Sequence, residues 1–401
     1  MYVLQKTTQM SKVRRQTKLK KSAILYILTV LLILGLNIAA WNSTAFCDAY
    51  IAHVFPVWVN LYGRLTGLFP FSVGEWMIVA GVVLLIAAVI LFPAWIVCRL
   101  RKRQQFLKKI GKFYRFFAWT LLAVCLIMTL NCFILYHAST FSETYFGEDD
   151  GDYTIEELME LRNMVVEQCN HLSTEVKRSS DGSVIFKNNM KTEARTAMKE
   201  LGKTYAQLDG WYPKPKALLS SDFMCRQYMQ GYYFPFSMEA NYNDVMNDLR
   251  KPATMCHELA HLRGYIFEDE ANFIAYLACI QSEDVTFRYS GYLSVLNYLD
   301  NDLYKASKSD SDGYKTVAEK NPPLTEYRTV RNDNFFVSEE EWDRINGKAW
   351  LDTETVDEVT DTLIDTSLKV NGVSDGMVSY SRVVRLLLQY YRQNGGLGYN
   401  E

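Results

Sequence analysis

The chain has 401 residues, of which 49% are hydrophobic, and its formal net charge is only −2. Its 43 basic residues are unevenly placed, because seven lie in residues 1–21 and eight in residues 98–115, two segments without a single acid. The rest of the chain is therefore acidic, which argues against nucleic acid as a partner. The eight cysteines contain no CxxC pair, which disfavours a structural zinc or thioredoxin-like site, and there is no internal repeat.

Three apolar stretches are each about as long as the 20 residues that a helix needs to cross a bilayer. They cover residues 22–41, 73–97 and 116–136. The first is longer than the apolar core of a typical signal peptide and has no clear small-residue cleavage site, so we interpret it as retained. Residues 22–136 are predicted to form a membrane anchor of three transmembrane helices.

The two basic segments predict the orientation of this anchor in the cell membrane. Residues 1–21 and 98–115 each adjoin an apolar stretch, and basic segments beside membrane spans favour the cytoplasmic side. We therefore expect a multi-pass protein with a basic cytoplasmic tail over residues 1–21. Because the number of spans is odd, residues 137–401 are expected to be extracytoplasmic.

Residues 42–72, between the first two apolar stretches, are too aromatic for a solvated linker. They include Phe55-Pro56-Val57-Trp58-Val59 and Leu68-Phe69-Pro70-Phe71. Two interpretations are open. The segment lies at the membrane interface as an amphipathic or re-entrant element, or it forms a surface that holds the C-terminal domain or a membrane-proximal substrate.

Residues 137–401 are expected to form one domain, mainly α but of the α+β class. An aromatic segment over residues 231–243 reads as extended, and Pro235 confines it to an edge or a bulge. We interpret it as an edge strand that binds an extended peptide, with an ordinary half-buried strand as the alternative. Helical patterns cover residues 156–171, 191–208, 284–304 and 378–393, and loops are predicted at residues 179–183 and 307–313.

The most informative motif is His257-Glu258-Leu259-Ala260-His261. Positions i and i+4 lie on one face of a helix, so His257 and His261 can reach one metal ion while Glu258 points at a water beside it. Thr254 is a plausible N-cap for this helix, and Gly264 lies where a left-handed residue would end it. This spacing is typical of a zinc hydrolase.

A second predicted helix begins with acidic residues and runs over residues 268–279. A catalytic zinc usually takes three protein ligands, and His₂Glu is one of its usual sets. We prefer Glu268 as the third ligand, because Asn272 one turn later could orient a ligand histidine. Glu270 is the alternative. These acids could also do no more than complement a helix dipole.

The sequence resembles a known family on several runs of residues: 232–236, 239–241, 256–264, 268–273, 369–373 and 375–380. The family is an uncharacterised group of bacterial polytopic membrane proteins with a domain-of-unknown-function label, and the resemblance implies a zincin-like zinc-metallopeptidase domain. The spacing Glu268-x-x-Ala271-Asn272 is similar to the element that supplies the third ligand in gluzincins. One departure is the short interval of seven residues between His261 and Glu268.

We therefore predict a membrane-anchored zinc metallopeptidase that hydrolyses peptide or protein substrates outside the cell. His257, His261 and Glu268 would bind zinc, and Glu258 would act as general base. Tyr380 and Arg382 are candidates for stabilising the transition state, although either could be structural.

Two other classes of function could use the same motif. The alternative is a non-catalytic zinc-containing membrane sensor that binds external peptides or wall fragments. An intramembrane protease is disfavoured because residues 239–270 are too polar for a span. Cys256 and Cys279 flank the two helices, and a disulfide or two buried thiols are equally compatible with the sequence.

Overall fold

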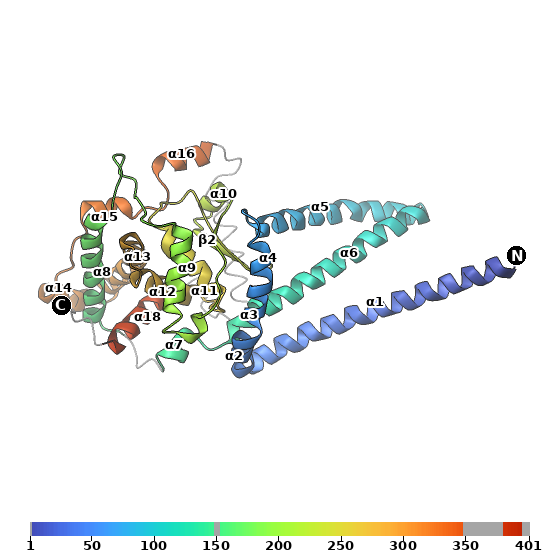
Figure 1. Cartoon of the computed structure of the whole chain (residues 1–401), viewed down its shortest axis with the longest axis horizontal. Coiled ribbons are helices and arrows are strands. Elements are labelled where there is room, and N and C mark those ends of the chain that lie inside the picture. The colour runs from blue at the N-terminus through green and yellow to red at the C-terminus, as the bar shows by residue number, and fades with distance from the viewer. Residues whose placement is uncertain (1, 148–152, 348–379, 395–401) are drawn as a thin grey trace. The chain divides into compact units, whose positions relative to one another are not determined.

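The computed structural model describes residues 2–147, 153–347 and 380–394, and it is mostly helical (Figure 1). It divides into two compact units. The anchor unit consists of Met1–Cys47 and Trp76–Ala138, and the globular unit consists of Asp48–Glu75 and Ser139–Glu401. We call residues Asp48–Glu75, which belong to the globular unit, the linking segment.

The anchor unit contains three helices that are long and apolar enough to cross a membrane, as the sequence predicts. The apolar spans are Lys21–Asn42 of α1 (Tyr2–Asn42), α5 (Val73–Leu100), and Gln104–His137, which comprises α6 (Gln104–Met128), η2 (Thr129–Phe133) and η3 (Leu135–His137). The third helix begins earlier than the predicted residue 116, so most of the basic segment is helical. Within this unit, Asn37 Nδ2 donates to Thr129 Oγ1 at 3.0 Å, a polar contact of the kind that joins membrane helices.

The linking segment is helical and packs on the rest of the globular unit. Its elements are α2 (Thr44–His53, which begins in the anchor unit), α3 (Phe55–Trp58), η1 (Val59–Gly63) and α4 (Arg64–Thr66). Thr66 Oγ1 donates to the carbonyl of Ser237 at 2.9 Å. A Cβ on Gly264 would lie 2.9 Å from Ile51, so these two residues are in close contact. One of the two interpretations of residues 42–72, a surface that holds the C-terminal domain, describes this packing.

A buried ion pair forms hydrogen bonds to the C-terminal end of the linking segment. Lys216 and Glu239 are both buried and form a close ion pair. Glu239 also accepts hydrogen bonds from the backbone amides of Val73 at 3.1 Å and Gly74 at 2.8 Å, while Lys216 Nζ donates to the carbonyl of Thr66 at 2.8 Å. Burying charge is costly unless the groups are paired and hydrogen-bonded, and here both conditions are met.

The globular unit has a helical core with a small sheet. The helices predicted over residues 156–171 and 284–304 are present, whereas the one predicted over 191–208 ends at Leu201. Of the helix predicted over 378–393, residues 380–393 are helical, and residues 378 and 379 lie outside the described part of the chain. The predicted loop over residues 307–313 is wrong, because Asp310 alone separates two helices and accepts a hydrogen bond from the amide of Gly313 at 2.9 Å. The helices are α7 (Phe141–Tyr145), α8 (Ile155–Glu175), α9 (Met190–Leu201), η4 (Ala206–Leu208), α10 (Ser221–Cys225), α11 (Lys251–His261), α12 (Glu268–Ile280), α13 (Val285–Ser309), α14 (Ser311–Lys320), α15 (Arg328–Asp333), α16 (Glu339–Gly347) and α18 (Tyr380–Gln393).

The sheet has three strands in the order β1-β3-β2, namely β1 (Lys216–Ala217), β3 (Glu239–Tyr242) and β2 (Gly231–Phe234). β1 is parallel to β3, and β2 is antiparallel to it with Gly231 opposite Tyr242. The prediction of one extended segment over residues 231–243 is wrong, because the chain turns after Phe234. Pro235, which has no amide hydrogen to donate, lies in this turn. Within the described ranges, β2 lies at an edge of the sheet, as predicted for the first part of the segment.

Candidate metal centre

The HExxH sequence lies on α11, and the chain then reverses into α12. α11 begins at Lys251 with Pro252 in its first turn, and no side chain caps it. Thr254 therefore lies inside the helix, and its predicted role as N-cap is wrong. Gly264 adopts a φ of +91°, as predicted for the residue that ends the helix. This reversal places the first residue of α12, Glu268, against the two histidines.

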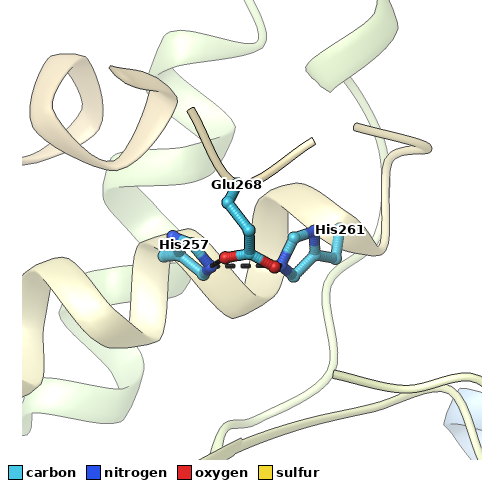
Figure 2. Close-up of side chains that lie close together, drawn as sticks. All are labelled: His257, His261 and Glu268. Carbon is cyan, nitrogen blue, oxygen red and sulfur yellow. Dashed lines mark hydrogen bonds and ion pairs between the residues drawn. The ribbon is translucent and has the colours of Figure 1, made fainter. Parts of the chain in front are cut away.

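The side chains of His257, His261 and Glu268 converge on one point (Figure 2). One ligand atom from each lies within 4.8 Å of the others. His257 Nε2 is 3.1 Å from His261 Nε2 and 3.0 Å from Glu268 Oε2, and His261 Nε2 is 3.7 Å from Glu268 Oε1. Two ligands of a tetrahedral zinc at 2.0–2.2 Å are about 3.3 Å apart, so the spacing suits such an ion.

The partners of the two histidines determine which ring nitrogen carries a proton. His261 Nδ1 lies 2.7 Å from the carbonyl of Tyr265, which can only accept. His257 Nδ1 lies 2.9 Å from Asn272 Oδ1, the contact that the sequence analysis anticipated for this residue. Both Nδ1 atoms therefore donate, and both Nε2 atoms present lone pairs to each other. Two lone pairs at 3.1 Å repel, so a proton or a metal ion has to lie between the rings.

The pKa values of the two histidines also indicate that one positive charge lies between the rings. Burial lowers the pKa of His257, but the adjacent Glu268 carboxylate outweighs it and the pKa rises to about 9. Burial lowers the pKa of His261 to about 4. Without a metal the pair thus holds one proton, and a divalent cation at this point would replace it.

Glu258 lies on the same helix as the histidines and is buried. Among the described residues, no group donates a hydrogen bond to its Oε2, and burial raises its pKa to about 8. A Cβ on Gly231 would overlap Glu258 Oε1 and would lie 2.8 Å from Thr254 Cγ2. Gly231 therefore leaves the space that the carboxylate occupies. The sequence alone does not indicate this role of Gly231, because nothing in the local sequence places β2 against α11.

Of the two acids proposed as third ligand, the structure brings only Glu268 to the histidines. Glu270 is buried elsewhere, where it accepts a close hydrogen bond from the amide of Phe141. The reason is helical geometry, since residues 268 and 270 of one helix point in different directions. Glu268 thus lies where a metal ligand would lie, whereas Glu270 accepts the hydrogen bond of the Phe141 amide.

The remaining candidates differ in what the structure describes of them. Tyr380 is the first residue of α18, but its side chain lies outside the described part of the chain. Arg382 lines a cavity with Asp269 and Glu270, and none of the three cluster residues takes part in that lining. Cys256 and Cys279 are free thiols with their sulfur atoms 3.9 Å apart, so of the two alternatives the structure has the buried thiols.

A family model described as "Protein of unknown function (DUF3810)" matches residues 50–388. The chain belongs to this family. No curated protein and no solved structure matches it significantly. The DUF3810 match includes nearly all of the linking segment as well as the cluster, in agreement with the resemblance to an uncharacterised family. Because the description of DUF3810 names no activity, the chemistry has to be inferred from the side chains.

Proposed function

We propose that the protein is a membrane-anchored zinc metallopeptidase with a zincin-like globular unit that works on the extracytoplasmic side. The observation that supports this most is the pair of imidazole Nε2 atoms 3.1 Å apart, both with lone pairs facing the Glu268 carboxylate. Such a donor set suits a zinc ion, and Asn272 and the carbonyl of Tyr265 fix the ring orientations as partners of zinc ligands usually do.

Each nearby side chain has a distinct task in peptide hydrolysis. A bound zinc would supply Lewis acidity toward the scissile carbonyl and the attacking water. Glu258 would take the proton of that water on its unpartnered Oε2 and deliver it to the leaving amine. His257, His261 and Glu268 hold the cation and take no part in proton transfer.

The substrate would lie along β2. In the described part of the chain this strand is an outer strand of the sheet, and extended peptides often bind beside such strands. Its first residue, Gly231, touches Glu258, and the ring of Tyr233 lies 5.7 Å from that of His261. A peptide that lies near β2 would therefore run past the carboxylate of Glu258 and the proposed metal ligands.

The direct test uses the full chain purified in detergent with a mixture of unstructured peptides. We expect hydrolysis that a zinc chelator stops and that added zinc restores, because the proposed reaction depends on a water activated by zinc. Mass spectrometry of the products would give the cleaved bonds. A preparation with about one zinc per chain that cleaves nothing would instead favour the sensor function.

The side of the membrane is tested separately in cells. A reporter that is active only outside the cell should work when fused after residue 401 and fail when fused near residue 105, because basic segments stay in the cytoplasm. Reporter activity at residue 105 would reverse the orientation and place the cluster inside the cell.

A further inference from the structure

The linking segment has two apolar faces, of which only one is buried. The buried face packs within the globular unit and consists of Ile51, Phe55, Val59, Gly63 and Thr66, which recur at helical spacing. Five large apolar side chains recur at the same spacing on another face, where they are exposed. We call them the apolar stripe: Val54, Val57, Leu61, Leu65 and Leu68, with exposed fractions between 41% and 78%.

Exposed apolar side chains continue past the end of the stripe. Phe69 and Phe71 follow it directly, and both are exposed. Leu219 comes from a distant part of the sequence, but its backbone amide donates to Glu75 Oε2 at 3.0 Å, and its side chain is 72% exposed. Scattered exposed apolar residues are ordinary on a soluble protein, whereas a row of neighbouring ones marks a surface that contacts an apolar partner.

The residues beside the stripe are of the types found where a membrane meets water. Trp58 and Tyr62 are partly buried, and their stacked rings have centroids 5.9 Å apart. Each precedes a leucine of the stripe by three residues, so both flank it on the helix surface. Arg64, which is exposed, precedes Leu68 by four residues. Such side chains combine an apolar body with a polar tip, which suits the depth of the lipid headgroups.

The position of the stripe in the chain identifies lipid as this apolar partner. The stripe lies between the apolar span that ends at Asn42 and the one that begins at Val73. Two consecutive membrane spans are joined at one surface of the bilayer, so both ends of the connecting segment lie at that surface. Lipid is therefore present beside the segment in every case, whereas a protein partner would have to be supplied by another chain.

We infer that the apolar stripe lies in the surface of the bilayer, at the boundary between the headgroups and the acyl chains. An amphipathic helix at this boundary buries its apolar face about 5–10 Å deep. The aliphatic side chains of the stripe face the acyl chains, while Trp58, Tyr62 and Arg64 lie among the headgroups. This inference rests on the membrane anchor of the proposed function and is independent of the peptidase activity.

The test uses the full chain in liposomes whose phospholipids carry a photoreactive group at one of two depths. The shallow probe has the group near the headgroup, and the deep probe has it at the end of the acyl chain. The exposed Tyr304 and Leu324, which lie outside the stripe in the globular unit, serve as controls. Mass spectrometry of peptides then locates the labelled residues.

The two probes should label the stripe and the spans differently. With the shallow probe, residues 54–68 should be labelled at least about tenfold more strongly than Tyr304 and Leu324, because only the stripe reaches the headgroup boundary. With the deep probe, labelling should be confined to the three spans.

Three results would overturn the inference. A stripe labelled no more strongly than the controls, beside labelled spans, would mean that a second copy of the chain or another protein covers it. A stripe that the deep probe labels as strongly as the spans would instead be a re-entrant element within the hydrocarbon. If neither probe labels the spans, the membrane anchor itself is wrong.

A pair of variants tests whether the side chains of the stripe hold it in lipid. Leu61→Ser and Leu65→Ser together replace two exposed leucines, so the fold measured by circular dichroism should not change, while shallow labelling of residues 54–68 should fall several-fold. Leu324→Ser is the control and should leave this labelling unchanged. Unchanged labelling in the double variant would mean that the neighbouring spans alone bring lipid to the segment, which would contradict the role of the stripe.

Discussion

Replacing Glu258 with Gln should abolish peptide hydrolysis while the protein keeps its zinc and its fold. Glutamine has nearly the shape of glutamate but cannot take a proton from water, and Glu258 does not belong to the cluster of ligand atoms. General base catalysis contributes about 10²–10⁴-fold to a rate, so at least this loss is expected. The measurement is the hydrolysis rate of the purified full chain, with zinc content and thermal unfolding as checks on integrity.

A second variant perturbs the Glu258 carboxylate by a substitution in β2 rather than in α11. Gly231→Ala places a Cβ where Glu258 Oε1 lies, so it should reduce hydrolysis with little effect on zinc. Gly347→Ala is the control, because no atom of the described residues lies within 4 Å of a Cβ at that position. Cells that carry either Glu258→Gln or His257→Ala test the peptidase function. If Glu258→Gln keeps every wild-type phenotype that His257→Ala loses, the metal ligands are needed but the general base is not, and the peptidase function is refuted.

Zinc should be lost from His261→Ala. The wild-type chain is expected to carry close to one zinc, and removing one of three ligands leaves too few to hold the ion tightly. Elemental analysis after dialysis against a weak chelator would show the difference. An unchanged zinc content in His261→Ala would end the assignment of this cluster as the metal site.

Glu268 and Glu270 form a matched pair in the same experiment. Glu268→Gln exchanges a carboxylate 3.0 Å from His257 Nε2 for a weaker ligand and should reduce zinc affinity at least about tenfold. Glu270→Gln retains an oxygen that can accept the hydrogen bond of the Phe141 amide and should leave zinc affinity unchanged. The reverse result would make Glu270 the ligand and would require α12 to rotate.

The sequence predicts those parts of the site that depend on local geometry. Two histidines four residues apart share a helix face whatever surrounds them, and Asn272 is one turn from Glu268 for the same reason. Length and hydropathy likewise define the three apolar spans. These features require no knowledge of the tertiary fold.

The parts that could not be predicted depend on contacts between distant residues. The turn that makes a hairpin of residues 231–242, and the contact of Gly231 with Glu258, arise only when β2 packs against α11. Similarly, the packing of the linking segment on the C-terminal domain is evident only from contacts such as that of Ile51 with Gly264. No periodic pattern in one segment carries such information.

Because the linking segment belongs to the globular unit, this unit can finish folding only after later parts of the chain have been synthesised. Residues 48–75 leave the ribosome before the last two spans, whereas the residues on which they pack, such as Ser237 and Glu239, follow much later. This unit is therefore discontinuous and cannot complete its core until two further helices have been inserted. A proteolytic cut after the third span would release a domain without Thr66, Val73 and Gly74, leaving the buried Lys216–Glu239 pair short of partners. Such a cut would thus destabilise the globular unit rather than release it as a stable soluble domain.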